Sequence, residues 1–263
     1  MLRPSELPGG PGTDITCPCC GGLSLEMFED TLDIENNIVG IQICLVCSAL
    51  INRSSLERLI SAPDKLRESQ TAQLGKVYVI GHHFDETLEQ EIQAHRRTLD
   101  FFIEQALKEN DPGELISAEI GIGRRSLLRA AAPLFRRCYG IDLAYTLFET
   151  TTDYLPVPAN VVLLEAITHV PEPIDVVFAW HSFEHVPRLH DLVAAIRSAL
   201  KPGGYLFFQI PLYRPNHVVE SHYTFLNRRA VAVLAELEQL QVVEMWTDHP
   251  RACLTCLLRK PGQ

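Results

Sequence analysis

The segment Ile174–Pro211, with the sequence IDVVFAWHSFEHVPRLHDLVAAIRSALKPGGYLFFQIP, constrains the fold more than any other part of the chain. Its order is an apolar run, a loop rich in His and Glu, an amphipathic helix, a Lys-Pro-Gly-Gly stop and a second apolar run. That order predicts a strand, a loop, a helix, a turn and a second strand. Because a helical crossover usually joins parallel strands, the segment predicts part of an α/β sheet.

Strands and helices continue to alternate on both sides of this segment. We predict strands over Leu115–Gly121, Cys138–Asp142, Asn160–Leu164, Asp175–Trp180, Tyr205–Ile210, Gln241–Trp246 and Ala252–Leu258. We predict helices over Arg125–Leu134, His190–Leu200 and Arg228–Leu240. This alternation predicts an α/β fold with a mainly parallel, doubly wound sheet. The last two strands follow one another without a helix, which predicts a terminal antiparallel hairpin.

The predicted sheet occupies only part of the chain, and composition divides the rest. Residues 1–16 are rich in Pro and Gly and are predicted to be a flexible N-terminus. Residues 17–61 form a small Cys-bearing unit. Residues 62–112 are predicted to be a mostly helical connector, because apolar residues recur at helical spacing over Glu86–Lys108. Residues 113–263 are predicted to form the α/β domain.

Two CxxC pairs, Cys17 with Cys20 and Cys44 with Cys47, are separated by 23 residues. Each pair turns two thiolates to one side of a tight loop, and two such knuckles supply the four sulfurs of a tetrahedral site. The spacing therefore predicts structural zinc. Cys19 is a surplus thiol that could compete as a ligand, and reduced or redox-active thiols are the alternative interpretation.

The charge distribution disfavours a nucleic-acid partner. The net charge is −10, and residues 1–113 carry 9 basic against 18 acidic residues. The remainder is nearly balanced, with 14 basic against 15 acidic, and residues 17–60 have two Arg against six acidic residues. A protein that binds phosphates is expected to show a coherent basic surface.

The chain also shows no export signal and no apolar run of about 20 residues, so we expect a cytoplasmic protein without a membrane span.

Acidic residues, glycines and one alanine lie at or just after the ends of the first three predicted strands. They are Glu119, Gly121, Gly123, Asp142, Glu165 and Ala166. Glycine at the first strand-to-helix turn lets the backbone approach a ligand closely. A carboxylate at the end of the next strand can accept the hydroxyls of a ribose. Three strand ends in this order predict a nucleotide-like cofactor more specifically than a glycine motif alone.

Together with the IDVV…FEHV…LKPGG letters of the segment Ile174–Pro211, these residues resemble class I S-adenosylmethionine-dependent methyltransferases, whose members often read FDVV…LEHV…LKPGG there. The resemblance here includes an N-terminal four-cysteine zinc-binding domain. The resemblance spans roughly Leu115–Lys260 and implies a Rossmann-like, seven-stranded sheet. It also implies cofactor contacts, with the methionine end at Glu119, Gly121 and Gly123, the ribose at Asp142, the adenine at Glu165 and Ala166, and Trp180 nearby.

The glycine loop departs from the family at one position. Arg125 stands where the family usually has a third Gly, and it could intrude on the methionine pocket or pair with the carboxylate of the ligand. NAD is the competing cofactor, but the last Gly of its GxGxxG motif would fall at Ser126. Arg125 also motivates an alternative function, a degenerate cofactor-binding module that docks a partner without catalysis.

The loop from His181 to His185 formally matches the HxxEH signature of zinc peptidases. That signature needs a helix, whereas this loop follows a strand and precedes Pro187, so peptidase chemistry is disfavoured. His181, His185 and His222 are candidate catalytic residues that could take a proton from an acceptor. Glu184 and His185 could instead orient the loop. Some small-molecule O-methyltransferases with a similar loop bind a divalent ion through Glu and His, which leaves that alternative open.

These observations predict transfer of a methyl group from S-adenosylmethionine to a small-molecule or glycan acceptor. The sequence does not distinguish O, N and C as the methylated atom, because the walls of the substrate site in this fold come from loops without a transferable pattern. An RNA methyltransferase is a further alternative, against which the acidic cysteine unit argues. No feature of the sequence predicts an oligomeric state.

Overall fold

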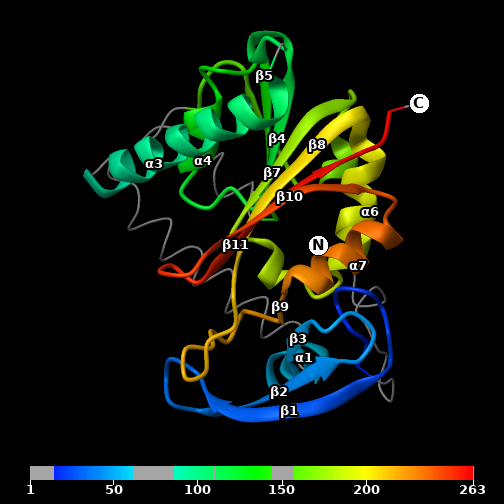
Figure 1. The fold of residues 1–263 in the computed structure, drawn as a ribbon. Helices are drawn as coiled ribbons and strands as arrows, with labels where there is room; N and C mark the ends of the chain where they lie inside the picture. The colour runs from blue at the N-terminus through cyan, green and yellow to red at the C-terminus, as the bar shows by residue number, and fades with distance from the viewer. Residues whose placement is uncertain (1–14, 62–85, 109, 144–156, 263) are drawn as a thin grey trace.

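A seven-stranded sheet forms the centre of the computed structural model, which describes residues 15–61, 86–108, 110–143 and 157–262 (Figure 1). The strand order is β10-β11-β8-β7-β4-β5-β6. Its strands are β4 (Ile116–Ile120), β5 (Arg137–Ile141), β6 (Val161–Leu164), β7 (Ile174–Trp180), β8 (Leu200–Pro211), β10 (Gln241–Asp248) and β11 (Cys253–Arg259). The strands from β8 to β6 are parallel, and β11 pairs antiparallel with β8 and β10. The predicted α/β sheet and its terminal hairpin are confirmed.

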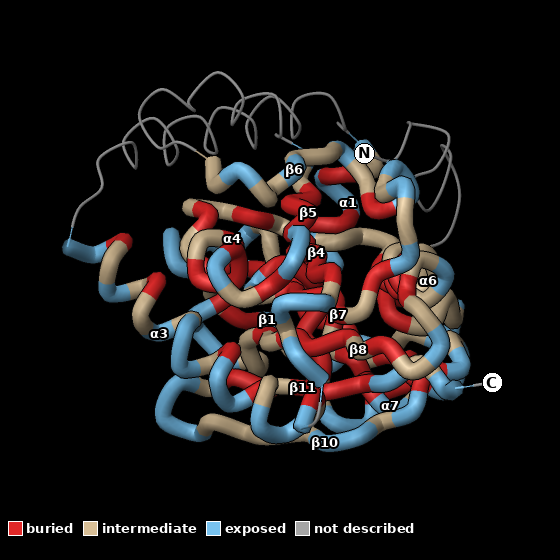
Figure 2. Tube along the Cα trace, turned by 90° about the horizontal axis from the view of Figure 1, so that it is seen from above, coloured by how far each residue is buried: buried red, intermediate tan, exposed pale blue. Residues whose placement is uncertain are grey.

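Helices cover both faces of this sheet (Figure 1). On one face lie α3 (Glu86–Phe102) and α4 (Ser126–Ala131), and on the other α6 (Leu189–Ala199) and α7 (Arg228–Leu237). Side chains of β7 alternate between the two cores, as the two-residue period of a strand requires. Val176 and Phe178 pack with α3, whereas Val177 and Ala179 pack with α6 and α7. Figure 2 shows these buried residues concentrated along the central strands.

The helix ends before the Lys-Pro-Gly-Gly sequence, as predicted, since α6 ends at Ala199, but the sequence itself lies inside a strand, so its prediction as a turn is corrected. β8 begins at Leu200, which pairs with Ile174, and the register shifts immediately afterwards. Gly203 has φ of 81°, and a Cβ on Gly204 would lie 3.0 Å from two backbone oxygens. The two glycines therefore let an irregular strand start pass close to β7, where the prediction placed a turn.

Predicted helices differ from the structure mainly at their carboxyl ends, and the predicted Arg228–Leu240 helix ends at Leu237 as α7. The predicted Arg125–Leu134 helix is shorter in the structure: α4 covers Ser126–Ala131, and Pro133 has no N–H with which to continue the helical hydrogen bonds. α3 continues into a π-helical turn over Ile103–Leu107. Short 3-10 helices cover Pro112–Glu114, Ile167–His169 and Phe183–His185.

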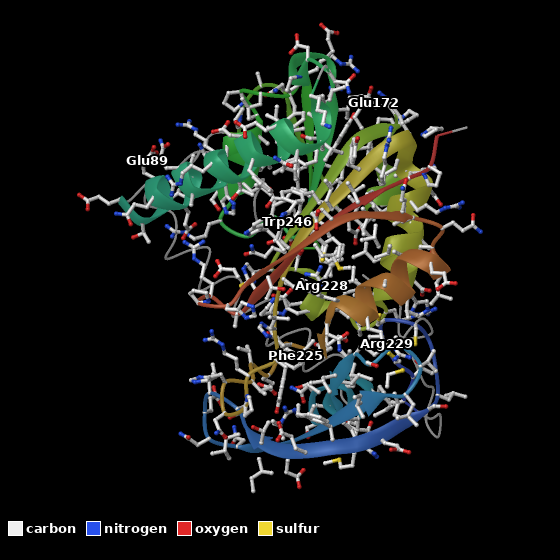
Figure 3. All side chains as sticks on the ribbon, in the orientation of Figure 1. Glu89, Glu172, Phe225, Arg228, Arg229 and Trp246 are labelled. Atoms are coloured by element: carbon white, nitrogen blue, oxygen red, sulfur yellow. The ribbon has the colours of Figure 1, made fainter. Side chains whose placement is uncertain are left out.

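A second, four-stranded sheet carries the cysteine unit. Its strands are β1 (Leu25–Leu32), β2 (Ile38–Cys44), β3 (Leu50–Asn52) and β9 (Thr224–Phe225), in that order, and α1 (Arg53–Ser61) packs on β2. The fourth strand comes from the connection between β8 and α7, so a segment of the α/β domain completes this sheet. Phe225 lies buried with Val39 and Ile41 of β2 (Figure 3).

Some predictions fall outside the described residues, namely those for residues 1–14 and 62–85. The division into residues 1–16, 17–61, 62–112 and 113–263 stays a prediction. Among the helices that the structure describes, none combines the length and apolar character needed to cross a bilayer.

Candidate functional site

Four cysteines meet at the end of the cysteine unit that faces α6 and α7. The Sγ atoms of Cys17 and Cys47 are 3.6 Å apart, as are those of Cys20 and Cys44, and all four lie within 4.8 Å of one another. Tetrahedral zinc with Zn–S bonds of about 2.3 Å separates its sulfurs by about 3.8 Å, so this donor set fits the ion. Cys19 is not part of this set: its Sγ lies 3.5 Å from the Ala230 carbonyl oxygen, although its thiol also interacts with Cys47.

The cluster also favours a thiolate. A hydrogen bond from the Cys17 thiol lowers the pKa of Cys47 to about 2, and the same interaction raises the pKa of Cys17. A bound divalent cation would favour the thiolate form of all four cysteines. The predicted ligands are therefore assembled, and Cys19 is outside the group.

The predicted cofactor residues lie along one edge of the central sheet. Glu119 is the second-last residue of β4, Asp142 follows β5 and Glu165 follows β6. These strands are parallel neighbours, and the Asp142 N–H donates to the Leu164 carbonyl oxygen at 3.0 Å. The three carboxylates therefore follow the carboxyl ends of adjacent strands, where open α/β sheets bind their ligands.

The loop between β4 and α4 needs its glycines. Gly121 has φ of 73°, and a Cβ there would come within 2.6 Å of the Cβ of Ser182. Asp142 fixes the loop, because its Oδ2 accepts the Ile122 N–H at 3.1 Å. Arg125 has φ of 63°, the left-handed conformation that glycine adopts without strain. The departure at Arg125 thus changes the side chain and keeps a backbone suited to glycine.

Glu119 is the most deeply buried acid of this edge, at 4 % exposure. Its Oε2 has no hydrogen-bond partner among the described residues. Burial, and then the nearby charge of Asp142, raise its pKa well above the usual value. A buried carboxyl group of this kind can accept a hydrogen bond from a ligand with an ammonium or hydroxyl group.

His181 follows β7 directly and is held by two side chains. The amide nitrogen of Gln209 donates to Thr255 at 2.8 Å, which leaves its Oε1 to accept from His181 Nε2 at 3.1 Å. Nδ1 lies 3.5 Å from Oε1 of Glu184. The interaction with Glu184 raises the pKa of His181 against the opposing effect of burial. Nε2 therefore has a hydrogen-bond partner, and Nδ1 faces the Glu184 carboxylate.

His185 and His222 complete a group around Glu184. Their ring centroids are 4.8 Å apart, and one ring nitrogen of each lies within 4.8 Å of a Glu184 carboxylate oxygen. Burial acts to raise the pKa of Glu184, but the surrounding histidines, first His181, hold it below its usual value. Burial and then His185 lower the pKa of His222 to about 4. The structure thus brings together all three predicted histidines.

α3 adds a wall that the sequence did not identify as functional. Its Glu91 pairs with Arg124 of the glycine loop at 2.9 Å, and one turn later the ring of His95 contacts Trp180 edge-on at 5.9 Å. Burial, and then the charge of His181, lower the pKa of His95 to about 4. The spacing of four residues between Glu91 and His95 was the available signal, because it places both on one face of a helix.

Comparisons with known proteins agree with this architecture. The sequence matches a family model described as a methyltransferase domain over residues 87–249. No curated protein matches the chain.

Solved structures of similar fold include the cyclase SpnF, with 15% identity, a TM-score of 0.52, and coverage of 65% of this chain and 82% of SpnF. A putative methyltransferase from Bacillus halodurans is 13% identical with a TM-score of 0.50, over 63% of this chain and 99% of that one. Magnesium protoporphyrin IX methyltransferase from Synechocystis PCC 6803, solved with bound S-adenosylhomocysteine, is 10% identical with a TM-score of 0.50, over 68% and 89%. These likenesses show the fold.

Proposed function

The chain belongs to the methyltransferase-domain family and is an S-adenosylmethionine-dependent methyltransferase, and from this premise we propose that it methylates a small-molecule or glycan acceptor. The row of carboxylates at the ends of β4, β5 and β6 is the observation that carries the cofactor site. Asp142 would accept the ribose hydroxyls, and Glu165 with Ala166 would face the adenine. Glu119, Gly121 and Gly123 would receive the methionine end, because Glu119 has a buried oxygen without a hydrogen bond among the described residues.

The histidine group would lie at the acceptor side of this cofactor. His181 and Glu184 follow β7, whose carboxyl end shares an edge with that of β4. Trp180 and His95 would form the wall under α3. Methyl transfer needs the acceptor about 3 Å from the methyl carbon and in line with the breaking C–S bond. Loops on both sides of the edge can provide that placement and exclude water.

The three predicted catalytic histidines differ in what they can do for an acceptor. His181 contacts Gln209 through Nε2 and faces the Glu184 carboxylate through Nδ1, so we propose that it holds Glu184 and the loop in place. His222 has a lowered pKa and is neutral near pH 7, so its imidazole can accept a proton, but the same lowered pKa makes it a weak base. His185 would position His222 through their ring contact.

We propose that Cys17, Cys20, Cys44 and Cys47 hold one structural zinc ion. Four protein ligands leave no open position for water or substrate. The cysteine unit packs against α6 and α7, and Pro18 accepts hydrogen bonds from both the backbone and the side chain of His190. The ion would therefore support a wall of the enzyme rather than take part in the chemistry.

Calorimetric titration of the purified protein with S-adenosylmethionine tests the cofactor site. We expect one site per chain and tighter binding of the product S-adenosylhomocysteine or of the substrate than of free adenosine. Absence of heat at millimolar cofactor would contradict the proposal. If the Arg125→Gly variant then bound the cofactor, the degenerate docking module would be the better description.

A further inference from the structure

Glu184 is a buried carboxylate whose surroundings do not satisfy it. It is 2 % exposed, and neither carboxylate oxygen has a hydrogen-bond partner among the described residues. Nδ1 of His181 lies 3.5 Å from its Oε1, and that ring is charged only when it is protonated. Burying a charge is costly unless the charge is paired at close range or coordinates a metal. The geometry around Glu184 therefore calls for a further partner.

His185 has the tautomer of a metal ligand. Its Nδ1 lies 2.9 Å from the carbonyl oxygen of Ser221. A carbonyl oxygen only accepts, so Nδ1 carries the hydrogen, and in the neutral ring Nε2 keeps its lone pair. Histidines that bind metals commonly donate their other N–H to a backbone carbonyl in this way. This hydrogen bond is independent of the burial of Glu184.

His222 supplies the third donor from a distant part of the chain. It lies in the connection between β8 and β9, where its N–H donates to the Val219 carbonyl oxygen at 3.0 Å. Donor atoms of Glu184, His185 and His222 all lie within 4.8 Å of one another. Ligand bonds of about 2.0–2.2 Å allow donors up to about 4.4 Å apart, so small side-chain adjustments would close the set. His181 is not part of this set of donor atoms, and its Nε2 already contacts the Gln209 Oε1 at 3.1 Å.

We propose that Glu184, His185 and His222 bind a divalent first-row transition-metal ion at the acceptor side of the site. Two imidazoles and one carboxylate suit zinc, cobalt, iron or manganese, whereas calcium and magnesium favour oxygen ligands. Three protein ligands leave open positions, unlike the four-cysteine cluster. His185 is exposed, which gives the ion a route of entry.

The ion would also define the acceptor class, and this step rests on the proposed function. An acceptor hydroxyl or carbonyl oxygen would occupy an open position, which fixes its orientation and makes a hydroxyl more acidic. The preferred acceptor is then one with two neighbouring oxygen donors, such as a vicinal diol or a hydroxy acid. As ligands, His185 and His222 would not accept the hydroxyl proton themselves; the ion would lower the pKa of the bound hydroxyl, whose proton would leave to solvent water.

Titration of the full-length, zinc-loaded protein with Co²⁺ tests the site without cofactor or acceptor. Calorimetry should show one Co²⁺ bound per chain, and visible absorption should show weak d–d bands without a thiolate charge-transfer band. Glu184→Gln and His222→Asn should each weaken binding by about 100-fold or more, since even loss of an outer-shell partner costs about 10–100-fold. Thermal unfolding verifies that each variant folds.

His217→Asn is the matched control, because His217 is an exposed histidine of the same connection. It should bind Co²⁺ like the wild type. Absence of Co²⁺ binding would overturn the proposal, as would Co²⁺ binding that survives both substitutions or is lost equally in the control. The S-adenosylmethionine titration is a separate measurement, so failure of the cofactor site and failure of the metal site are distinguishable.

Discussion

The backbone N–H of Tyr223 donates a 2.7 Å hydrogen bond to the carbonyl oxygen of Glu184. The carbonyl oxygen of Tyr223 in turn accepts the Asn52 N–H at 3.0 Å. Asn52 ends β3, only a few residues after the second cysteine pair. This chain of hydrogen bonds joins the cysteine cluster to the loop that carries Glu184, and it fixes the residue next to His222.

Loss of the cysteine cluster is therefore expected to disturb the histidine group. Cys44→Ser should lower the zinc content from about one ion per chain to none and reduce the free energy of unfolding by several kcal/mol, because metal binding contributes to folding. Metal analysis and urea denaturation measure both effects. Hydrogen exchange should also show reduced protection of the Tyr223 and Asn52 amides.

Cys253→Ser is the control for this prediction. Cys253 is buried in β11, outside the four-cysteine group, so the variant should keep its zinc. A folded wild-type protein that contains no zinc would contradict the assignment of the four cysteines.

The positions of the acidic residues could be predicted from the sequence, and those of the histidines only in part. Glu119, Asp142 and Glu165 each end a recognisable strand, and parallel strands bring such ends to one edge. The approach of His222 to His185 depends on β9, a two-residue strand that pairs with β3 of the other sheet. So short a strand has no periodicity, and its pairing joins segments far apart in sequence.

Asp142→Asn should weaken binding of S-adenosylmethionine by about 10- to 100-fold, since hydrogen bonds to a charged group are worth about 1.5–3 kcal/mol. The amide oxygen of Asn can still accept the Ile122 N–H, so the glycine loop should keep its shape. Calorimetric titration measures the change. Asp100→Asn, on the exposed face of α3, is the matched control and should bind like the wild type. Equal affinity in all three proteins would argue against the ribose assignment.

Arg125→Gly should be more stable than Arg125→Ala by about 1 kcal/mol. Both variants lose the same buried guanidinium group, but only glycine adopts a φ of 63° without a steric penalty, which costs other residues about 1–2 kcal/mol. Urea denaturation of the two variants isolates this backbone contribution, because the lost side-chain contacts cancel in the comparison. Equal stabilities would show that the loop relaxes out of the left-handed conformation.

His95→Gln should make the protein less sensitive to acid. The folded-state pKa of His95 is about 4, whereas a histidine in the unfolded chain titrates near about 6.5. Between these values the unfolded state binds more protons than the folded state, so stability falls as the pH decreases from about 6.5 towards 4. Removing the imidazole removes this contribution, roughly 1–2 kcal/mol between pH 7 and 5 after allowing for partial solvent exposure.

Urea denaturation at pH 7 and pH 5 gives the change in unfolding free energy with pH for each protein, and this change is compared between the variant and the wild type. The loss of unfolding free energy on acidification should be smaller in His95→Gln than in the wild type, while the exposed-site control His217→Gln should follow the wild type. A wild-type slope in His95→Gln would show that His95 is not buried against Trp180 in solution.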